Sequence, residues 1–209
     1  MNTNLDPYVV FPWDKNFETG IALIDEQHQV LIGILNKLVN TMAESDTKAL
    51  NATFEELIDY ADFHFNDEES IWMNHFPDDP WLASHQSTHA SFLPAIEEMK
   101  KQGELNERAD NNEEIIKYLI RWLAFHIIDI DHRMAIAVKE IDAGVPIDEA
   151  KHIANKKMIG STRISIETIL NLYEGLSART LDMMREKKSR INTEAKLKEA
   201  TEKLENQKG

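Results

Sequence analysis

With 209 residues, the chain is long enough for one domain core and an additional segment. Because it contains no cysteine, disulfides, thiolate metal sites, iron–sulfur clusters and cysteine nucleophiles are excluded, and a tightly bound metal ion must be held by His, Asp and Glu. A formal net charge of −14 argues against nucleic acid as a partner, since phosphate binding requires basic surfaces.

The sequence predicts neither a membrane-spanning segment nor a secretory leader. No apolar run approaches the ~20 residues that are needed to cross a bilayer. The first residues, MNTNLDPYVVFPWDKNF, lack the basic start and the apolar stretch of a signal peptide. We therefore expect a cytoplasmic protein that has no membrane partner.

Helical periodicity dominates the chain after an irregular N-terminal arm, residues 1–20. Apolar residues such as Ile24 and Leu31 recur at helical spacing, and the pattern breaks at polar or proline-containing stretches. Helices are predicted at about Ile21–Met42, Lys48–Asn74, Trp81–Gln102 and Asn111–Asp142. Short connections between them are typical of an up-down-up-down four-helix bundle, so residues 21–145 are predicted to form an all-α domain.

Residues 146–209 have a different character and predict a long helix, because no proline follows Pro146. A heptad pattern with two apolar positions runs through this segment and weakens after Met183. Its apolar residues are Ile159, Ile166, Tyr173, Ile169, Leu176 and Met183, followed by Leu197 and Leu204. Such a seam is typical of a coiled coil, so we expect a homodimer through this helix. The alternative is a fifth helix that folds back on the bundle.

Histidines occur inside the apolar pattern of every predicted bundle helix. In chain order the helices contribute His28 (in IDEQH), His64 and Glu68 (in HFNDE), His85 and His89 (in HQSTH), and His126 (in WLAFHIIDID). Residues four apart share one face of a helix, so His85 and His89 can reach the same ion. A single buried histidine is more commonly a hydrogen-bonded core residue than a ligand. Inward placement from all four helices favours a metal centre, because each buried polar group is costly without a partner.

Four stretches in this order make the chain similar to bacterial hemerythrins over roughly residues 10–140: WDKNFETGIALIDEQH, HFNDEE, HQSTH and WLAFHIIDID. The resemblance implies a hemerythrin-like bundle with two non-haem iron ions, which are bridged by two carboxylates and an oxo or hydroxo group. By position, it implies that His85, His89 and His126 hold one iron, that His28 and His64 hold the other, and that Glu68 and Asp131 are the bridging carboxylates. The iron of His28 and His64 is the one that keeps an open position for O2.

The spacing between His126 and Asp131 does not suit a regular α-helix. Side chains five residues apart point ~140° away from each other, whereas a bridging carboxylate has to face the same site as His126. A local irregularity, such as a π-type turn, is therefore predicted between them. Asp129 is the competing candidate for the bridging role, and the family pattern favours Asp131.

Other residues near the motifs are not expected to bind the metal ions. His75 and His132 are predicted to lie on the surface or beside the ligands without binding metal, and His152 lies outside the bundle pattern. Glu69 points ~100° away from Glu68 and is predicted to form a salt bridge or to support a ligand. The tryptophans are interpreted as core and packing residues: Trp13, Trp72, Trp81 and Trp122.

Ligand type alone does not identify the metal, because imidazole binds Zn, Cu, Fe and Ni; iron is implied by the resemblance. Five neutral imidazoles with two carboxylates leave an iron pair less electron-rich than in carboxylate-rich di-iron oxidases. This ligand balance favours reversible O2 binding over O–O cleavage. Motifs for hydrolysis or phosphate binding are absent from the sequence, so the chain itself is not expected to be an enzyme.

Three functions remain open at this point: O2 storage or delivery, sensing, and a role as a redox enzyme or a scavenger of nitric oxide or iron. Members of the hemerythrin family are also fused to methyl-accepting or diguanylate cyclase modules, and the ending LKEATEKLENQKG resembles a connecting coiled coil. The favoured hypothesis is an oxygen or redox sensor. It would pass the state of the metal site to the C-terminal helix and to an output domain outside this chain, such as a diguanylate cyclase.

Overall fold

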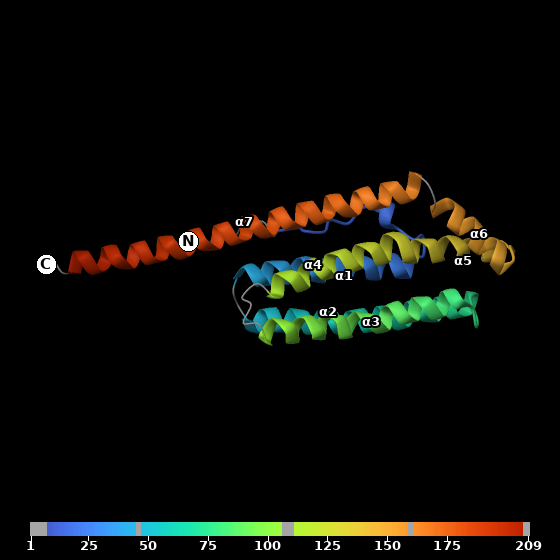
Figure 1. The fold of residues 1–209 in the computed structure, drawn as a ribbon, viewed down its shortest axis with the longest axis horizontal. Coiled ribbons are helices and arrows are strands. Elements are labelled where there is room, and N and C mark those ends of the chain that lie inside the picture. The colour runs from blue at the N-terminus through green and yellow to red at the C-terminus, as the bar shows by residue number, and fades with distance from the viewer. Residues whose placement is uncertain (1–7, 45–46, 106–110, 159–160, 207–209) are drawn as a thin grey trace.

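The structure, a computed structural model, describes residues 8–44, 47–105, 111–158 and 161–206 (Figure 1). The described residues form helices and no strands, which confirms the all-α prediction. The helices are α1 (Ala22–Glu44), α2 (Thr47–His75), α3 (Pro80–Leu105), α4 (Asn111–Phe125), α5 (His132–Asp142), α6 (Ile147–Met158) and α7 (Ser161–Asn206), with a 3-10 turn, η1 (Lys15–Phe17), and a π-helical turn, η2 (His126–Asp131). The predicted bundle helices begin and end within three residues of these bounds.

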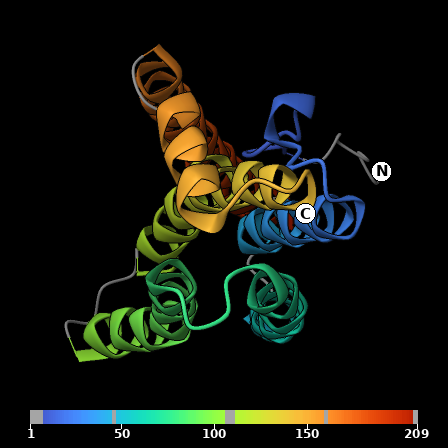
Figure 2. The same cartoon turned by 90° about the vertical axis from the view of Figure 1, so that its right-hand side faces the viewer.

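Helices α1 to α4 surround a common core. Contacts join α1 to α2, α2 to α3, α3 to α4 and α4 to α1, and Figure 2 shows this ring of helices end on. Successive helices run in opposite directions, as the colour sequence in Figure 1 shows. The bundle therefore has the predicted up-down-up-down arrangement. Within the described residues, no helix combines the length and apolar character that crossing a bilayer requires.

The core consists of two apolar clusters with a polar layer between them. On α2, Glu68 lies between Phe65 of the larger cluster and Trp72 of the smaller one. On α3, the two histidines of HQSTH lie between Leu82 of the smaller cluster and Phe92 of the larger one. The polar layer is thus sealed by apolar side chains on both sides along the bundle axis, and water is kept out of it.

The predicted irregularity in the fourth bundle helix is present as the π-helical turn η2. A π-turn contains more residues than an α-helical turn, so residues five apart can face the same side. His126 and Asp131, at the two ends of η2, are both fully buried, with 1% and 0% of their surface exposed. The extra residue of the turn therefore brings both side chains into the core.

The N-terminal arm is attached to α1 by hydrogen bonds between its backbone and asparagine side chains of that helix. The amide oxygen of Asn36 accepts hydrogen bonds from the backbone N–H groups of Val10 and Phe11, and the Asn40 side chain exchanges hydrogen bonds with the backbone of Tyr8. Val10 and Phe11 are completely buried. These two residues of the arm consequently belong to the bundle core.

The C-terminal segment differs from the prediction of one long helix. It forms two helices: α6 packs against α5, and α7 packs against α4 with further contacts to α1 and α6. The turn into α6 lets Ala150 and Ala154 bury their small side chains in the smaller apolar cluster, which the sequence periodicity did not reveal. The reversal brings α7 back along the bundle, as Figures 1 and 2 show.

Helix α7 is attached to the bundle over its first part only. Thr180 and Met184 are buried, whereas Met183 is 55% and Leu197 is 67% exposed. The ammonium group of Lys187 still lies over the Tyr8 ring of the N-terminal arm, 5.4 Å from its centroid. The C-terminal end of α7 continues past the end of the bundle (Figure 1). The alternative of a helix that folds back is therefore correct for the first part of α7. The remaining heptad side chains lie outside the described ones: Ile159, Ile166, Ile169, Tyr173, Leu176 and Leu204.

Candidate metal centre

Five imidazoles and two carboxylates meet in the polar layer of the bundle. Each of these side chains belongs to a residue that is no more than 5% exposed. They come from α1 (His28), α2 (His64 and Glu68), α3 (His85 and His89) and η2 (His126 and Asp131). The structure thus brings together all the residues that the sequence singled out as candidate ligands.

Glu68 lies at the centre of this cluster. One set of potential ligand atoms, all within 4.8 Å of one another, comes from Glu68, His85, His89 and His126, and a second set comes from Glu68, His28 and His64. The Oε2 atom of Glu68 is 3.4 Å from Nε2 of His89 and 3.8 Å from Nε2 of His64. Glu68 is therefore shared by a group of three imidazoles and a group of two.

Asp131 spans the same two groups with its two oxygen atoms. Its Oδ1 atom is 3.0 Å from Nε2 of His85 and 3.1 Å from Nε2 of His126, both of the three-imidazole group. Its Oδ2 atom is 3.3 Å from Nε2 of His28, of the two-imidazole group. Asp129, the competing candidate, instead pairs with Arg133 and is partly exposed. The π-turn thus directs Asp131, and not Asp129, into the cluster.

Burial favours the neutral form of three imidazoles, those of His64, His89 and His126, and both carboxylates have shifted pKa values. Desolvation and the neighbouring histidines lower the pKa of His64 and His89, and burial lowers the pKa of His126 to about 3. Burial, together with the charge of Asp131, raises the pKa of Glu68 well above its usual value. For Asp131, burial alone would raise the pKa, but the surrounding imidazoles hold it well below its usual range. Neutral imidazoles are the form that binds metal ions.

Several buried polar atoms of the cluster have no hydrogen-bond partner among the described residues. They are both ring nitrogens of His28, Nε2 of His64, both carboxylate oxygens of Glu68, Nδ1 of His85 and of His126, and Oδ2 of Asp131. Buried polar groups in folded proteins nearly always have a partner, and each unsatisfied one costs roughly 1–3 kcal/mol. Two divalent cations would satisfy the atoms that face the centre of the cluster. The donor set, imidazole and carboxylate without thiolate, fits a pair of such ions.

Two imidazoles are oriented by side chains outside the cluster. Nδ1 of His89 donates a hydrogen bond to Oε1 of Glu69 at 2.8 Å, which fits the supporting role predicted for Glu69. Nδ1 of His64 lies 2.9 Å from Oε1 of Gln27, a residue that the sequence analysis did not identify. Its position directly before His28 gave no signal, because neighbouring residues of a helix point about 100° apart.

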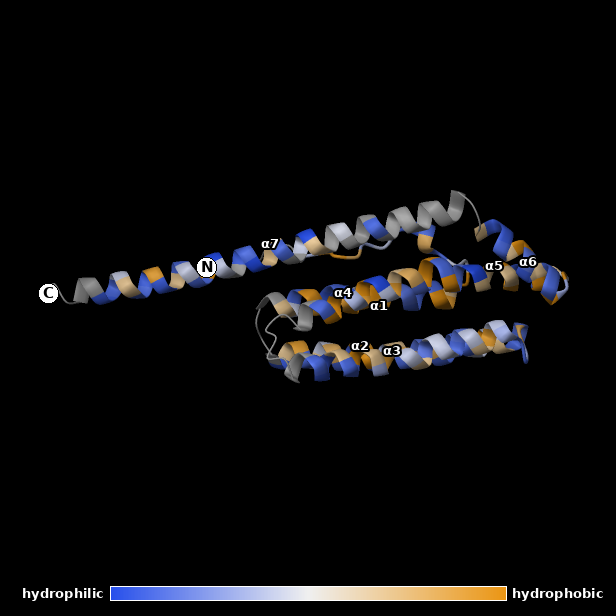
Figure 3. Cartoon of the chain, viewed as in Figure 1, coloured by the Kyte–Doolittle hydropathy of each residue, from blue (hydrophilic) through white to orange (hydrophobic). Residues whose placement is uncertain are grey.

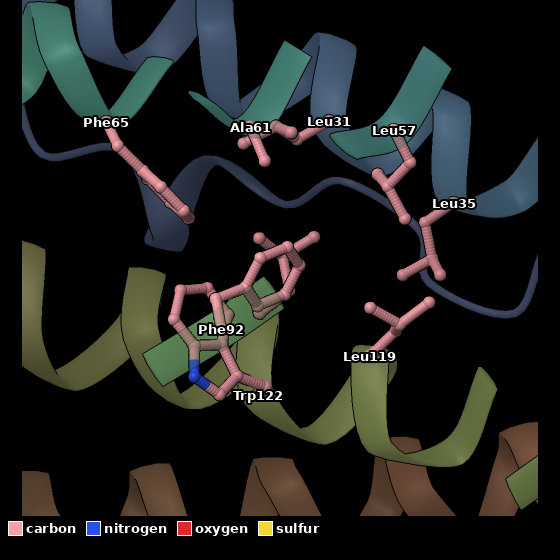
Figure 4. A pocket seen from close by; sticks show the side chains of 9 residues that line it. Leu31, Leu35, Leu57, Ala61, Phe65, Phe92, Leu119 and Trp122 are labelled. Carbon is pink, nitrogen blue, oxygen red and sulfur yellow. The ribbon is translucent and has the colours of Figure 1, made fainter. Parts of the chain in front are cut away.

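Aromatic rings cover the cluster on the side of the larger apolar cluster. The Phe65 ring stacks on His89 with 3.8 Å between ring centroids, and the Trp122 ring stacks on His126 at 4.5 Å. Both rings also line a small apolar pocket, which Figure 4 shows between Phe65 of α2 and Trp122 of α4. These contacts confirm the packing role predicted for Trp122 and exclude water from the imidazoles.

The remaining histidines lie outside the two ligand groups of the described residues. His75 bonds with its ring nitrogens to the backbone oxygen of Ile71 and to Asp142. His132 is partly buried and directly follows the π-turn, and His152 is exposed on α6. Their exclusion from the ligand set remains a prediction.

A helical bundle whose core holds a buried cluster of histidines and carboxylates defines a metal-binding domain. Residues 19–135 match the hemerythrin HHE cation-binding domain, and this match covers more than half of the chain. The chain therefore belongs to the hemerythrin family. The match ends within α5 and does not include α6 or α7.

Curated relatives carry the same family name. A bacteriohemerythrin of Stenotrophomonas maltophilia is 30% identical over 127 residues, 61% of this chain and 80% of the relative. A bacteriohemerythrin of Pseudomonas aeruginosa is 28% identical over 140 residues, 63% of this chain and 89% of the relative. A myohemerythrin of Theromyzon tessulatum is 30% identical over 123 residues, 59% of this chain and 89% of the relative. No solved structure matches the chain significantly.

Proposed function

We propose that this chain binds two iron ions and O2 in the polar layer of its bundle, and that it acts as an oxygen or redox sensor. The observation that carries the metal site is the position of Glu68, which belongs to both groups of potential ligand atoms. Iron and O2 follow from membership in the hemerythrin family. When bound, a non-haem iron pair supplies reversible O2 binding.

Each ion would be held by one of the two groups of imidazoles. His85, His89 and His126 would hold one ion and His28 and His64 the other, with Glu68 and Asp131 shared by both. The group with two imidazoles supplies fewer ligands, so its ion is the one with a position for O2. The stacked rings of Phe65 and Trp122 exclude water from the imidazoles.

Anaerobic iron loading followed by exposure to O2 tests the metal site and its ligand. We expect about two iron ions per chain, and a visible charge-transfer band that appears with O2 and disappears on degassing. Fewer than two iron ions would contradict the seven-residue ligand set. Two iron ions that oxidise at once, without a reversible band, would instead support the redox enzyme or scavenger.

The sensing proposal rests on two connections between the cluster and the C-terminal helices. In the first, the π-turn that carries His126 continues α4, and α7 packs directly on α4. In the second, Arg133 binds Asp129 of the π-turn and also donates to Asn155 of α6, at 3.0 Å. A change in the π-turn would therefore reach α7 along α4 and would reach α6 through Arg133.

Such a sensor requires two arrangements of the helices with similar free energies. Amide hydrogen exchange along α6 and α7, in the reduced and in the O2-bound protein, tests for them. We expect protection to change in α7 and the change to shrink in Arg133→Leu, which removes the link to Asn155. Equal protection in both states would contradict the sensing proposal and leave iron and O2 binding intact.

In the proposed sensor, α7 pairs with the same helix of a second copy in a coiled coil. This coiled coil leads to an output domain outside this chain, such as a diguanylate cyclase. The exposed residues Met183 and Leu197 support a partner helix, because they are fourteen residues apart and share one face in a heptad pattern. Analytical ultracentrifugation tests this step. A monomer at concentrations well above those of the cell would contradict the homodimer.

Storage or delivery of O2 is the second candidate. It is favoured by the curated relatives, because the matched part of this chain covers 80% of the Stenotrophomonas maltophilia protein and 89% of the Pseudomonas aeruginosa protein. Most of those proteins therefore corresponds to the bundle. Storage requires reversible O2 binding without any response in α7, so the hydrogen-exchange experiment separates the two functions.

A further inference from the structure

Two imidazoles of the metal cluster form hydrogen bonds through Nδ1, and their partners differ in charge. On the three-imidazole side, His89 donates from Nδ1 to the carboxylate of Glu69. On the two-imidazole side, the Nδ1 atom of His64 faces the neutral amide of Gln27. The two distances are nearly equal, 2.8 Å and 2.9 Å, so the difference between the sides is one of charge and not of geometry.

Both partners are themselves held in place by a second hydrogen bond. Gln86 donates from Nε2 to Oε2 of Glu69 at 3.1 Å. Gln27 donates from its own Nε2 to Oδ2 of Asp67 at 2.7 Å, which leaves its Oε1 atom to accept from His64. The carboxylate of Asp67 is thus separated from His64 by the whole Gln27 amide. Gln27 is 4% exposed and Glu69 has 23% of its side chain exposed, so neither contact is a loose surface contact.

A carboxylate that accepts a hydrogen bond from a ligating imidazole makes that imidazole a stronger electron donor, whereas an amide does so much less. The three-imidazole side therefore receives extra negative charge from Glu69, and the two-imidazole side does not.

We propose that Glu69 and Gln27 are a pair of positioning residues that make the two metal sites electronically unequal. Glu69 strengthens binding and favours the higher oxidation state at the site of His85, His89 and His126. Gln27 fixes His64 without adding charge and leaves the site of His28 and His64 electron-poorer. This inference rests on the proposed binding of two metal ions.

Exchanging the charge at the two positions tests the inference. The full chain is loaded anaerobically with Fe(II), the affinities of the two binding events are measured by chelator competition, and the midpoint potential of the iron centre is measured by spectroelectrochemistry. Glu69→Gln removes the charge, and Glu69→Asp keeps the carboxylate. Gln27→Glu adds a charge beside His64 and is made together with Asp67→Asn, because Nε2 of Gln27 lies 2.7 Å from Oδ2 of Asp67 and two carboxylates there would repel each other. Glu55→Gln, an exposed position on α2, controls for the loss of a distant charge.

We expect Glu69→Gln to weaken the binding of one of the two ions by about 10–100-fold and to raise the midpoint potential. Gln27→Glu is expected to lower the midpoint potential, Glu69→Asp to restore most of the wild-type behaviour, and Glu55→Gln to leave both quantities unchanged. Because general damage to the site cannot move the potential in opposite directions, the opposite signs identify the electronic effect.

Two results would overturn the inference: shifts in the same direction for Glu69→Gln and Gln27→Glu, or shifts no larger than that of Glu55→Gln. The wild-type titration separates these outcomes from failure of the proposed function. If the wild-type chain binds two ions and the variants do not differ, the inference alone is wrong. If the wild-type chain does not bind two ions, the proposed metal site is wrong.

Discussion

The polar layer of the bundle and the distal part of α7 are both helical and both rich in charged or polar residues, but their surroundings are opposite. The candidate ligands are almost completely buried, and several of their polar atoms lack a hydrogen-bond partner. From Ser189 to Lys203 the side chains of α7 are exposed, and Figure 3 shows mainly hydrophilic residues there. A polar residue in a helix thus indicates a binding site only where it is buried and its polar atoms cannot form hydrogen bonds to water.

The same difference bears on stability. Ion pairs within α7, such as Arg190 with Glu194 and Lys198 with Glu202, are exposed and contribute about 0.3–0.5 kcal/mol each. An isolated helix with such weak support is marginal in water, and the proposed dimer would supply the missing packing for the distal part of α7. The polar layer, by contrast, leaves buried polar atoms without partners, which the proposed metal ions would satisfy. The predictions below separate the two regions further.

The largest expected effect is the loss of metal-dependent stability in Glu68→Gln. Metal binding should stabilise the wild-type bundle by about 2.7 kcal/mol per site at a free-ion concentration of 100 Kd, and the variant should lose most of this gain at both sites. Without metal, the variant should be at least as stable as the wild type, because a buried carboxylate without partners is removed. Thermal unfolding with and without Fe(II) measures both effects.

Glu55→Gln is the matched control for that experiment, because it makes the same change at an exposed position of α2. It should keep the full stabilisation by metal. A Glu68→Gln variant that is stabilised by Fe(II) as strongly as the wild type would show that Glu68 is not shared by the two sites.

The metal-free protein should lose stability between pH 7 and pH 5. Burial lowers the pKa values of His64, His89 and His126 below the ~6.5 of an unfolded chain, in His126 to about 3, so unfolding takes up protons in this range. Glu68 opposes this, since its raised pKa contributes stability that is lost as the pH rises. The protons that three histidines take up on unfolding outnumber the one that Glu68 releases. Each net proton taken up lowers the free energy of unfolding by about 1.4 kcal/mol for each unit by which the pH decreases.

Urea unfolding of the metal-free protein at several pH values measures this slope. His152→Gln, at an exposed position of α6, should leave the slope unchanged. A free energy of unfolding that is constant or increases from pH 7 to pH 5 would contradict the neutral state of the buried imidazoles.

Two neighbouring methionines of α7 should differ in their contribution to stability. Met184 is 4% exposed and packs in the larger apolar cluster, so Met184→Ala should cost about 2–3 kcal/mol. Met183 is 55% exposed, so Met183→Ala should change the free energy of unfolding by less than about 0.5 kcal/mol. Equal effects in chemical denaturation would mean that α7 is not attached to the bundle as described.

The smallest effect is expected from removing residues 191–209. The described side chains of this segment are exposed, so the shortened chain should keep its thermal stability to within about 0.5 kcal/mol and should keep its iron content. If the distal helix forms the proposed dimer, the same deletion should abolish self-association. A large loss of iron would instead connect this segment to the metal site and would contradict the separation of the two regions.

Much of the bundle could be predicted because its signals are local. Pro77 and Pro80 end one helix and begin the next, and the helix bounds follow from such breaks. The π-turn could also be predicted, since His126 and Asp131 are five residues apart and both had to face one site. The seven candidate ligands were recognisable because they repeat known spacings on four helices in order.

The features that escaped prediction depend on contacts between distant parts of the chain. Gln27 reaches His64, which is 37 residues away, and nothing in the local sequence separates it from a surface glutamine. The packing of α6 on α5 buries small residues such as Ala150, and the periodicity of the sequence does not reveal this. The heptad placed Met183 on the seam but could not show that Met184 packs on the bundle.

A crystal structure of the iron-loaded chain, with anomalous scattering at the iron edge, tests the central claim most directly. The account predicts two iron positions in the polar layer, one bound by His85, His89 and His126 and the other by His28 and His64, with Glu68 in contact with both. A single iron position, or two positions of which one does not touch Glu68, would contradict it.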